Sequence, residues 1–171
     1  QDARFRRLPF QQKIGAGLAL EQFARKKAEG ALRHVGLTES MHMIASRLGW
    51  RLDRTEEVIA PVVADREVGS EEITVRPGMA SGVEQIGSAY VGDEERIRLE
   101  FRACLGEPDV QDTVIVDGEP PLRFTIPGGV NGDIATCAML TNAVPVVVNS
   151  PPGLRTMADI PPVSWFAGAR W

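Results

Sequence analysis

The segment from Ile126 to Thr136 holds the residues best suited to binding chemistry. It reads Ile-Pro-Gly-Gly-Val-Asn-Gly-Asp-Ile-Ala-Thr, so three glycines come just before or at the start of an apolar stretch with helical spacing. Glycines let a backbone pass close to a ligand, and exposed amides at a helix start favour an anionic or polar group. An ordinary glycine turn followed by a capped helix explains the pattern equally well, so both interpretations stay open.

The histidines and cysteines give weaker signals. His34 and His42 are candidate acid-base groups because of their residue type, but they have no nucleophile beside them in sequence, which favours a surface or hydrogen-bonded structural role. Cys104 and Cys137 lack CxxC spacing, and the chain has only two histidines, so we expect no metal site and no disulfide. We predict two free thiols, most often buried ones.

Two acidic segments and one glycine-rich segment also favour structural interpretations. Glu56 and Glu57 near a strand start, and the run Asp93-Glu94-Glu95 in a hairpin turn, are predicted to be solvated charges. The stretch from Ile14 to Gly17 lacks the third glycine of a dinucleotide-binding fingerprint and the βαβ unit around it. We therefore interpret it as a plain turn.

Composition bounds the class of protein. The chain has 171 residues, 43% of them hydrophobic and 25% charged, which predicts one globular domain with one core. A pI near 5.3 argues against nucleic-acid binding. No apolar run approaches the roughly 20 residues of a membrane helix, and no signal-peptide core is visible, so we expect a soluble, cytoplasmic protein without a membrane partner. The start without Met suggests a fragment or a processed chain.

Helical spacing occurs in three places. Residues 20–29 and 37–48 have apolar positions at helical intervals, with Gly30 and Gly49 as stops and Thr38 as an N-cap candidate. The third helix is expected at 134–148, with Asn131 or Asp133 as its cap and Pro145 as a kink or break.

Between these helices the pattern changes to period two. Ile97, Leu99 and Phe101 alternate with charged residues, which places one strand face on a core and the other in water. Short turns between successive strands predict an α+β fold with a mostly antiparallel sheet of about five to seven strands from Arg51 to Ile126 and the helices packed on one face. Strands are expected at 2–10 (an edge), 58–63, 72–76, 80–91, 96–105, 113–116 and 122–126.

Five segments, spread over nearly the whole chain, carry a family resemblance. They resemble, in the same order, the C-terminal domain of the 2,4-diaminopentanoate dehydrogenase and dihydrodipicolinate-reductase-like family, which includes NAD(P)-dependent amine dehydrogenases. The segments are Leu8 to Gly17, His34 to Ser40, Ile126 to Thr136, Asn142 to Pro145 and Pro151 to Met157.

The resemblance implies a substrate-binding and dimer-forming domain that follows an N-terminal Rossmann domain absent from this chain. The implied reaction moves hydride between the nicotinamide of NAD or NADP and an imine carbon, with a small amine or carbonyl substrate. A catalytic carboxylate is expected in the nucleotide-binding half, so no catalytic residue and no cofactor are expected for this chain alone. The residues implied to face nicotinamide and substrate are Asn131, Asp133, Thr136, Leu140 and Asn142.

A homodimer is also predicted, because one sheet face has no helix left in the sequence to cover it. The competing hypothesis is a stand-alone module that binds a small ligand or only assembles, without catalytic activity. A nucleotide-binding half in the native protein would favour the oxidoreductase, and its absence would favour the module. Two alternatives stay open for the hydroxyl of Thr136: it points into the site, or it donates a hydrogen bond back to a helix carbonyl.

Overall fold

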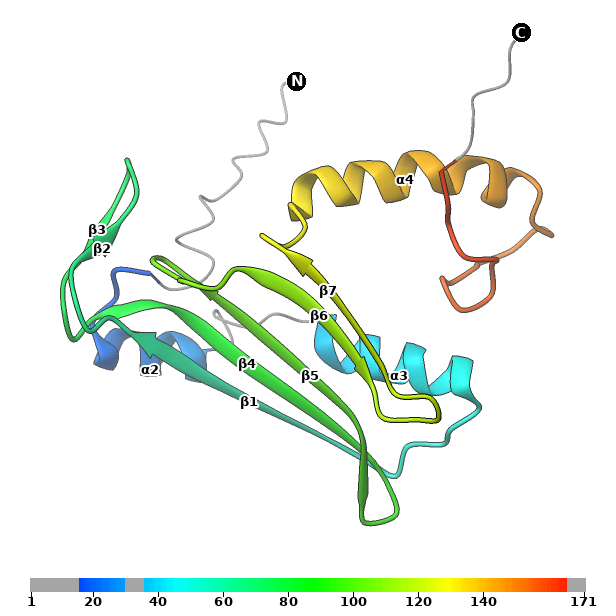
Figure 1. Cartoon of the computed structure of the whole chain (residues 1–171), viewed down its shortest axis with the longest axis horizontal. Helices are drawn as coiled ribbons and strands as arrows, with labels where there is room; N and C mark the ends of the chain where they lie inside the picture. The colour runs from blue at the N-terminus through cyan, green and yellow to red at the C-terminus, as the bar shows by residue number, and fades with distance from the viewer. Residues whose placement is uncertain (1–15, 30–35, 166–171) are drawn as a thin grey trace, which may run out of the picture. The chain divides into compact units, whose positions relative to one another are not determined.

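A computed structural model describes residues 16–29 and 36–165 of the chain (Figure 1). The chain divides into two compact units, Gln1–Glu107 and Pro108–Trp171. Each unit has its own antiparallel strands, and each is described here by itself.

The first unit is built on three long strands. β1 (Arg54–Val63), β4 (Ala80–Val91) and β5 (Glu94–Cys104) form an antiparallel sheet in the order β1-β4-β5. A short second pair, β2 (Val68–Gly69) with β3 (Thr74–Val75), lies in the connection between β1 and β4. β4 is therefore the central strand, paired along its length with both neighbours (Figure 1).

Two helices pack on one face of this sheet. Phe23 of α2 (Leu20–Ala28) clusters with Val83, whereas Met41 of α3 (Gly36–Leu48) clusters with Ala89. Val83 and Ala89 lie an even number of positions apart on β4, so their side chains point to the same face. The predicted packing of these two helices on one sheet face is confirmed, although the buried residues form two clusters rather than one core.

The opposite sheet face carries ion pairs on β4 and β5. Arg102 on β5 pairs with Glu84 on β4 at 3.0 Å, and Arg98 pairs with Glu100 at 2.6 Å. The predicted alternation along this strand is confirmed, since Ile97 on the other face is 7% exposed. Val58 of β1 points to the same face and is 60% exposed, so this face carries both charged and apolar side chains, and the dimer expected from it stays a prediction.

The second unit has a hairpin and one helix. β6 (Gln111–Val116) pairs with β7 (Leu122–Pro127), and α4 (Gly132–Val148) follows after a short turn. Among the described residues of this unit only Ile160 is buried. Most of the large apolar side chains that are exposed in the described structure belong to this unit.

The α+β class and the antiparallel pairing agree with the sequence prediction, but the single sheet does not. Within residues 16–29 and 36–165, the seven strands form three separate sheets. Short links predict which strands are neighbours in a hairpin, but they carry no information about pairing between hairpins. α4 belongs to the second unit, so its predicted packing on the sheet of the first unit stays a prediction.

Several local predictions also change. α3 begins at Gly36, so Thr38 lies inside its first turn and is not the N-cap. Pro145 lies within α4 and does not end it, since the helix continues to Val148. The predicted strand at 2–10 and the stop at Gly30 lie outside the described residues. Across the described ranges, no helix is both long enough and apolar enough to cross a bilayer.

Candidate functional site

The turn between β7 and α4 is the centre of the candidate site. Gly128 and Gly129 have φ angles of +79° and +67°, a backbone conformation that strains residues with a side chain. The Gly128 amide donates to the Val110 carbonyl at 2.7 Å, and the Gly129 amide donates to the Ile126 carbonyl at 3.1 Å. Two successive left-handed residues thus redirect the chain from the hairpin into the helix.

Asn131 caps α4. Its Oδ1 accepts hydrogen bonds from the amides of Asp133 and Ile134, both at 3.1 Å, which confirms Asn131 as the cap rather than Asp133. The capped-helix alternative therefore describes this segment. The Asn131 side chain therefore occupies two of the first-turn amides that an anionic ligand could otherwise use.

Thr136 also bonds within the helix. Its hydroxyl donates to the Gly132 carbonyl at 2.7 Å, one turn earlier. Thr141 makes the same kind of bond to the Cys137 carbonyl at 2.9 Å. Of the two alternatives for the Thr136 hydroxyl, the structure has the back-bond.

The five predicted site residues do not share one side of α4. Successive residues turn by about 100° around a helix axis, so Asp133, Thr136 and Leu140 lie on one side. By the same rotation, Asn142 lies on the opposite side, in line with the cap. Leu140 is 69% exposed whereas Asn142 is half-buried. A ligand on one side of the helix can meet only part of the predicted set.

Asp112 is a residue of this site that the sequence did not reveal. It lies on β6 opposite Ile126, and its Oδ2 accepts a hydrogen bond from the Val130 amide at 2.7 Å. Asp112 precedes Val114 and Val116 in an ordinary strand pattern, and no sequence motif identifies it as a site residue. Only the register of the hairpin brings it to the turn before α4.

The start of α4 does not fit a nucleotide pyrophosphate. The Asn131 side chain fills two first-turn amides, and Asp133 places a carboxylate in the same turn. Asp112 adds a second carboxylate at the preceding turn. The negative charge of these carboxylates would repel a phosphate, so this end of the helix does not suit a pyrophosphate group.

A second polar cluster lies under α3. Glu57 on β1 accepts a hydrogen bond from the Thr38 hydroxyl at 3.1 Å and another from the Gln85 side-chain amide. Gln85 is fully buried and Glu57 is half-buried. The prediction of a solvated charge is therefore wrong for Glu57, whereas Glu56 is exposed and pairs with Arg54 at 2.8 Å. Glu94, predicted in a turn, begins β5.

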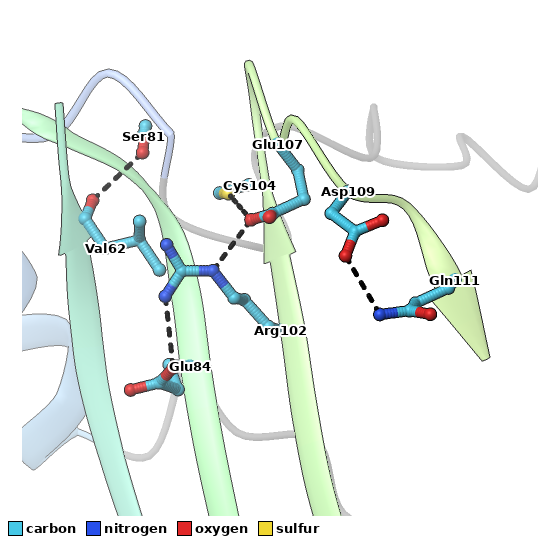
Figure 2. A network of polar contacts seen from close by, with 8 residues as sticks. All are labelled: Val62, Ser81, Glu84, Arg102, Cys104, Glu107, Asp109 and Gln111. Carbon is cyan, nitrogen blue, oxygen red and sulfur yellow. Dashed lines mark hydrogen bonds and ion pairs between the residues drawn. The ribbon is translucent and has the colours of Figure 1, made fainter. Parts of the chain in front are cut away.

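The two thiols are free but have different surroundings. Figure 2 shows Arg102 between Glu84 and Glu107, with the Cys104 thiol donating to the same Glu107 carboxylate at 3.2 Å. Burial, followed by the nearby Glu107, raises the pKa of Cys104. Cys137 is exposed and Cys104 half-buried, so the expectation of buried thiols is wrong for Cys137.

The remaining candidates add no chemistry to this site. His42 is exposed on α3, whereas His34 lies outside the described residues. In the described part of the chain, no group of three or more His, Cys, Asp or Glu side chains is arranged to hold a metal ion. Ala16 and Gly17 form a turn, as predicted, and Gly17 donates its amide to the Ala80 carbonyl at 2.8 Å.

Comparisons with known proteins agree on one family. Residues 9–170 match the family model described as the 2,4-diaminopentanoate dehydrogenase C-terminal domain. The 2,4-diaminopentanoate dehydrogenase of Acetoanaerobium sticklandii is 35% identical over 154 residues, which cover 86% of this chain and 43% of that protein.

A solved structure shows the same fold. The amine dehydrogenase from Mycobacterium smegmatis matches with a TM-score of 0.72 at 20% identity, over 91% of this chain and 46% of that one. The chain thus spans less than half the length of both relatives.

Proposed function

Because this chain belongs to the family of 2,4-diaminopentanoate dehydrogenase C-terminal domains, we propose that it is the substrate-binding half of an NAD(P)-dependent oxidoreductase. The substrates are amines or imines, in oxidative deamination or in its reverse, reductive amination. The single observation that carries this proposal is the family match over residues 9–170. The A. sticklandii relative is a 2,4-diaminopentanoate dehydrogenase, so we propose an aliphatic amine as the substrate class.

The start of α4 supports an amine as the ligand. An aliphatic amine is an ammonium ion near neutral pH, because its pKa lies near that of lysine. In this proposal the Asp133 carboxylate in the first turn supplies the negative charge that attracts it. We propose that Asp133 and Leu140 face the substrate, whereas Asn131 and Asn142 act from the other side of the helix to hold the segment in place.

The cofactor belongs to another part of the protein in this proposal. A dinucleotide needs helix-start amides that are free for its pyrophosphate, and the start of α4 is capped by Asn131. We propose that a Rossmann domain outside these residues binds NAD or NADP and carries the catalytic group. Both relatives are more than twice as long as the segment they share with this chain, which leaves room for that domain.

We further propose that the protein is a cytoplasmic homodimer. Val114 and Phe124 face each other across the hairpin and are 61% and 64% exposed. Apolar side chains paired on one exposed face are typical of surfaces that associate. Free Cys104 and Cys137 agree with a reducing compartment.

Cofactor binding by two samples tests whether NAD or NADP binds outside residues 1–171. Calorimetry with NADH and NADPH is run on residues 1–171 and on the intact native protein that contains them. We expect binding to the intact protein only. Micromolar binding to residues 1–171 alone would contradict the proposal, and no binding by either sample would favour the stand-alone module.

A further inference from the structure

We propose that Asp112 is a positioning residue that holds the turn before α4, and with it the substrate-facing start of that helix, in its working arrangement. The proposal rests on the proposed function, because it assumes that the start of α4 meets the amine. Asp112 itself is not expected to touch the reacting atoms. Its role is carried by its contact with the backbone of the turn.

Two hydrogen bonds tie the turn to the start of β6. The Gly128 amide donates to the Val110 carbonyl at 2.7 Å, and the Val130 amide donates to Asp112 Oδ2 at 2.7 Å. The first bond joins backbone groups and survives any side-chain change that keeps the fold. The second depends on one carboxylate, so it is the link that a substitution can remove.

The turn needs such a link because of its glycines. Gly128 and Gly129 both have positive φ, and glycine has more accessible conformations than any other residue. The Asp112 carboxylate also packs over this turn, since a Cβ built on Gly129 would lie 3.6 Å from Asp112 Oδ2. The carboxylate thus restricts a segment that its own sequence leaves adaptable.

The held residue is adjacent to the helix cap. Val130 directly precedes Asn131, whose Oδ1 accepts from the amides of Asp133 and Ile134. Asp112 therefore acts on Asp133 through two steps, first by holding Val130 and then through the cap. A carboxylate near a helix N-terminus is also favourable for the helix dipole, and a charged acceptor strengthens the bond to the amide.

The hydrogen bond between Val130 and Asp112 is exposed, so its effect on positioning can be measured apart from its effect on folding stability. Exposed hydrogen bonds add little to global folding, so removing this one should leave the protein folded. Small displacements of groups that orient a substrate can reduce catalysis by up to about 100-fold. The expected signature is a kinetic defect in a folded protein.

The test uses three variants of the intact native protein. Asp112→Ala removes the acceptor, and Asp112→Asn keeps an oxygen that can accept from Val130. Asp109→Ala is the matched control, because it removes a nearby carboxylate that accepts a hydrogen bond from the Gln111 side-chain amide at 3.0 Å. Steady-state kinetics with varied amine and varied cofactor are measured alongside hydrogen exchange of the Val130 amide.

For Asp112→Ala we expect kcat/KM for the amine to fall about 10-fold, with the KM for the cofactor unchanged. Val130 should exchange faster, Asp112→Asn should recover most of both effects, and Asp109→Ala should match the wild type within about twofold. A folded Asp112→Ala protein with unchanged amine kinetics would overturn the proposal, as would an Asp112→Asn protein as impaired as Asp112→Ala.

The exchange measurement keeps this proposal distinct from the proposed function. A wild-type protein that oxidises no amine would refute the proposed function, and the positioning of substrate with it. Faster Val130 exchange in Asp112→Ala alone would still support the hold on the turn. Unchanged Val130 exchange would refute that hold whatever the activity.

Discussion

The hydroxyl of Thr38 on α3 donates a 3.1 Å hydrogen bond to Oε2 of Glu57 on β1. Gln85, fully buried on the central strand, donates to the other oxygen of the same carboxylate. The two bonds tie the first turn of α3 to the sheet at a point where Gly87 leaves room for Met41. Thr38 thus stabilises the docking of the helix rather than capping it.

Replacing Thr38 by Val should therefore destabilise the protein. Losing one partly buried hydrogen bond to a charged group costs about 1 to 2 kcal/mol of unfolding free energy, measured by urea denaturation. The matched control is Glu56→Gln, which removes only an exposed ion pair with Arg54 and should cost less than about 1 kcal/mol. Equal effects of the two substitutions would contradict the role given to Thr38.

Thr136→Val should have little effect on catalysis. The hydroxyl that it removes donates its proton to the Gly132 carbonyl, so that proton is not available to a substrate. The unfolding free energy should change by less than about 1 kcal/mol, and the kinetics of the intact protein should match those of the wild type. A fall of about tenfold in kcat/KM for the amine, in a folded protein, would contradict this prediction and show that the hydroxyl takes part in substrate binding or catalysis.

The two thiols should react at different rates. Burial and the Glu107 carboxylate raise the pKa of Cys104, so at a given pH less of it is thiolate, the form that attacks alkylating agents. Cys137 is exposed and should be alkylated first at mildly alkaline pH, as followed by peptide mass spectrometry.

Removing the charge beside Cys104 provides the check on that explanation. Glu107→Gln should lower the pKa of Cys104 and shift the onset of its alkylation to lower pH, with Cys137 unaffected as the internal control. Cys104 reacting as fast as Cys137 in the wild type would show that its burial and its contact with Glu107 do not protect it.

Association should depend on the apolar face of the hairpin. Phe124→Asp places a charge between Val114 and its neighbours, and should weaken dimerisation by about tenfold or more. Thr125→Asp adds the same charge on the opposite face and should have a much smaller effect. Sedimentation that finds only an 18.6 kDa species for the unsubstituted chain at micromolar concentration would refute the dimer itself.

The sequence predicted what depends on local pattern. The strand at 80–91 agrees with β4 at both ends, and Asn131, one of the two cap candidates, caps α4. Gly49 ends α3 with a φ of +72°, as a glycine stop should. Each of these features is determined by a few consecutive residues, through side-chain alternation, capping or a positive φ.

The sequence did not predict what depends on contacts between distant residues. Glu57 looked like a surface charge because nothing near it in sequence shows that Thr38 and Gln85 will meet it. Asp112 was missed for the same reason, since only the β6–β7 register brings it to Val130. The site residues on α4 were listed as one set because family resemblance names positions without saying which side of a helix they occupy.

The central claim is that this chain is the substrate-binding half of an amine-oxidising enzyme, and one assay tests it most directly. The intact native protein is incubated with NAD⁺ or NADP⁺ and a panel that includes 2,4-diaminopentanoate and simple aliphatic amines, and nicotinamide reduction is followed by absorbance. We predict amine-dependent formation of NADH or NADPH that weakens in Asp133→Asn, with the loss mainly in KM for the amine. A folded intact protein that binds the cofactor but reduces none of it with any amine, and consumes none in reverse with ammonia and a ketone, would contradict the account.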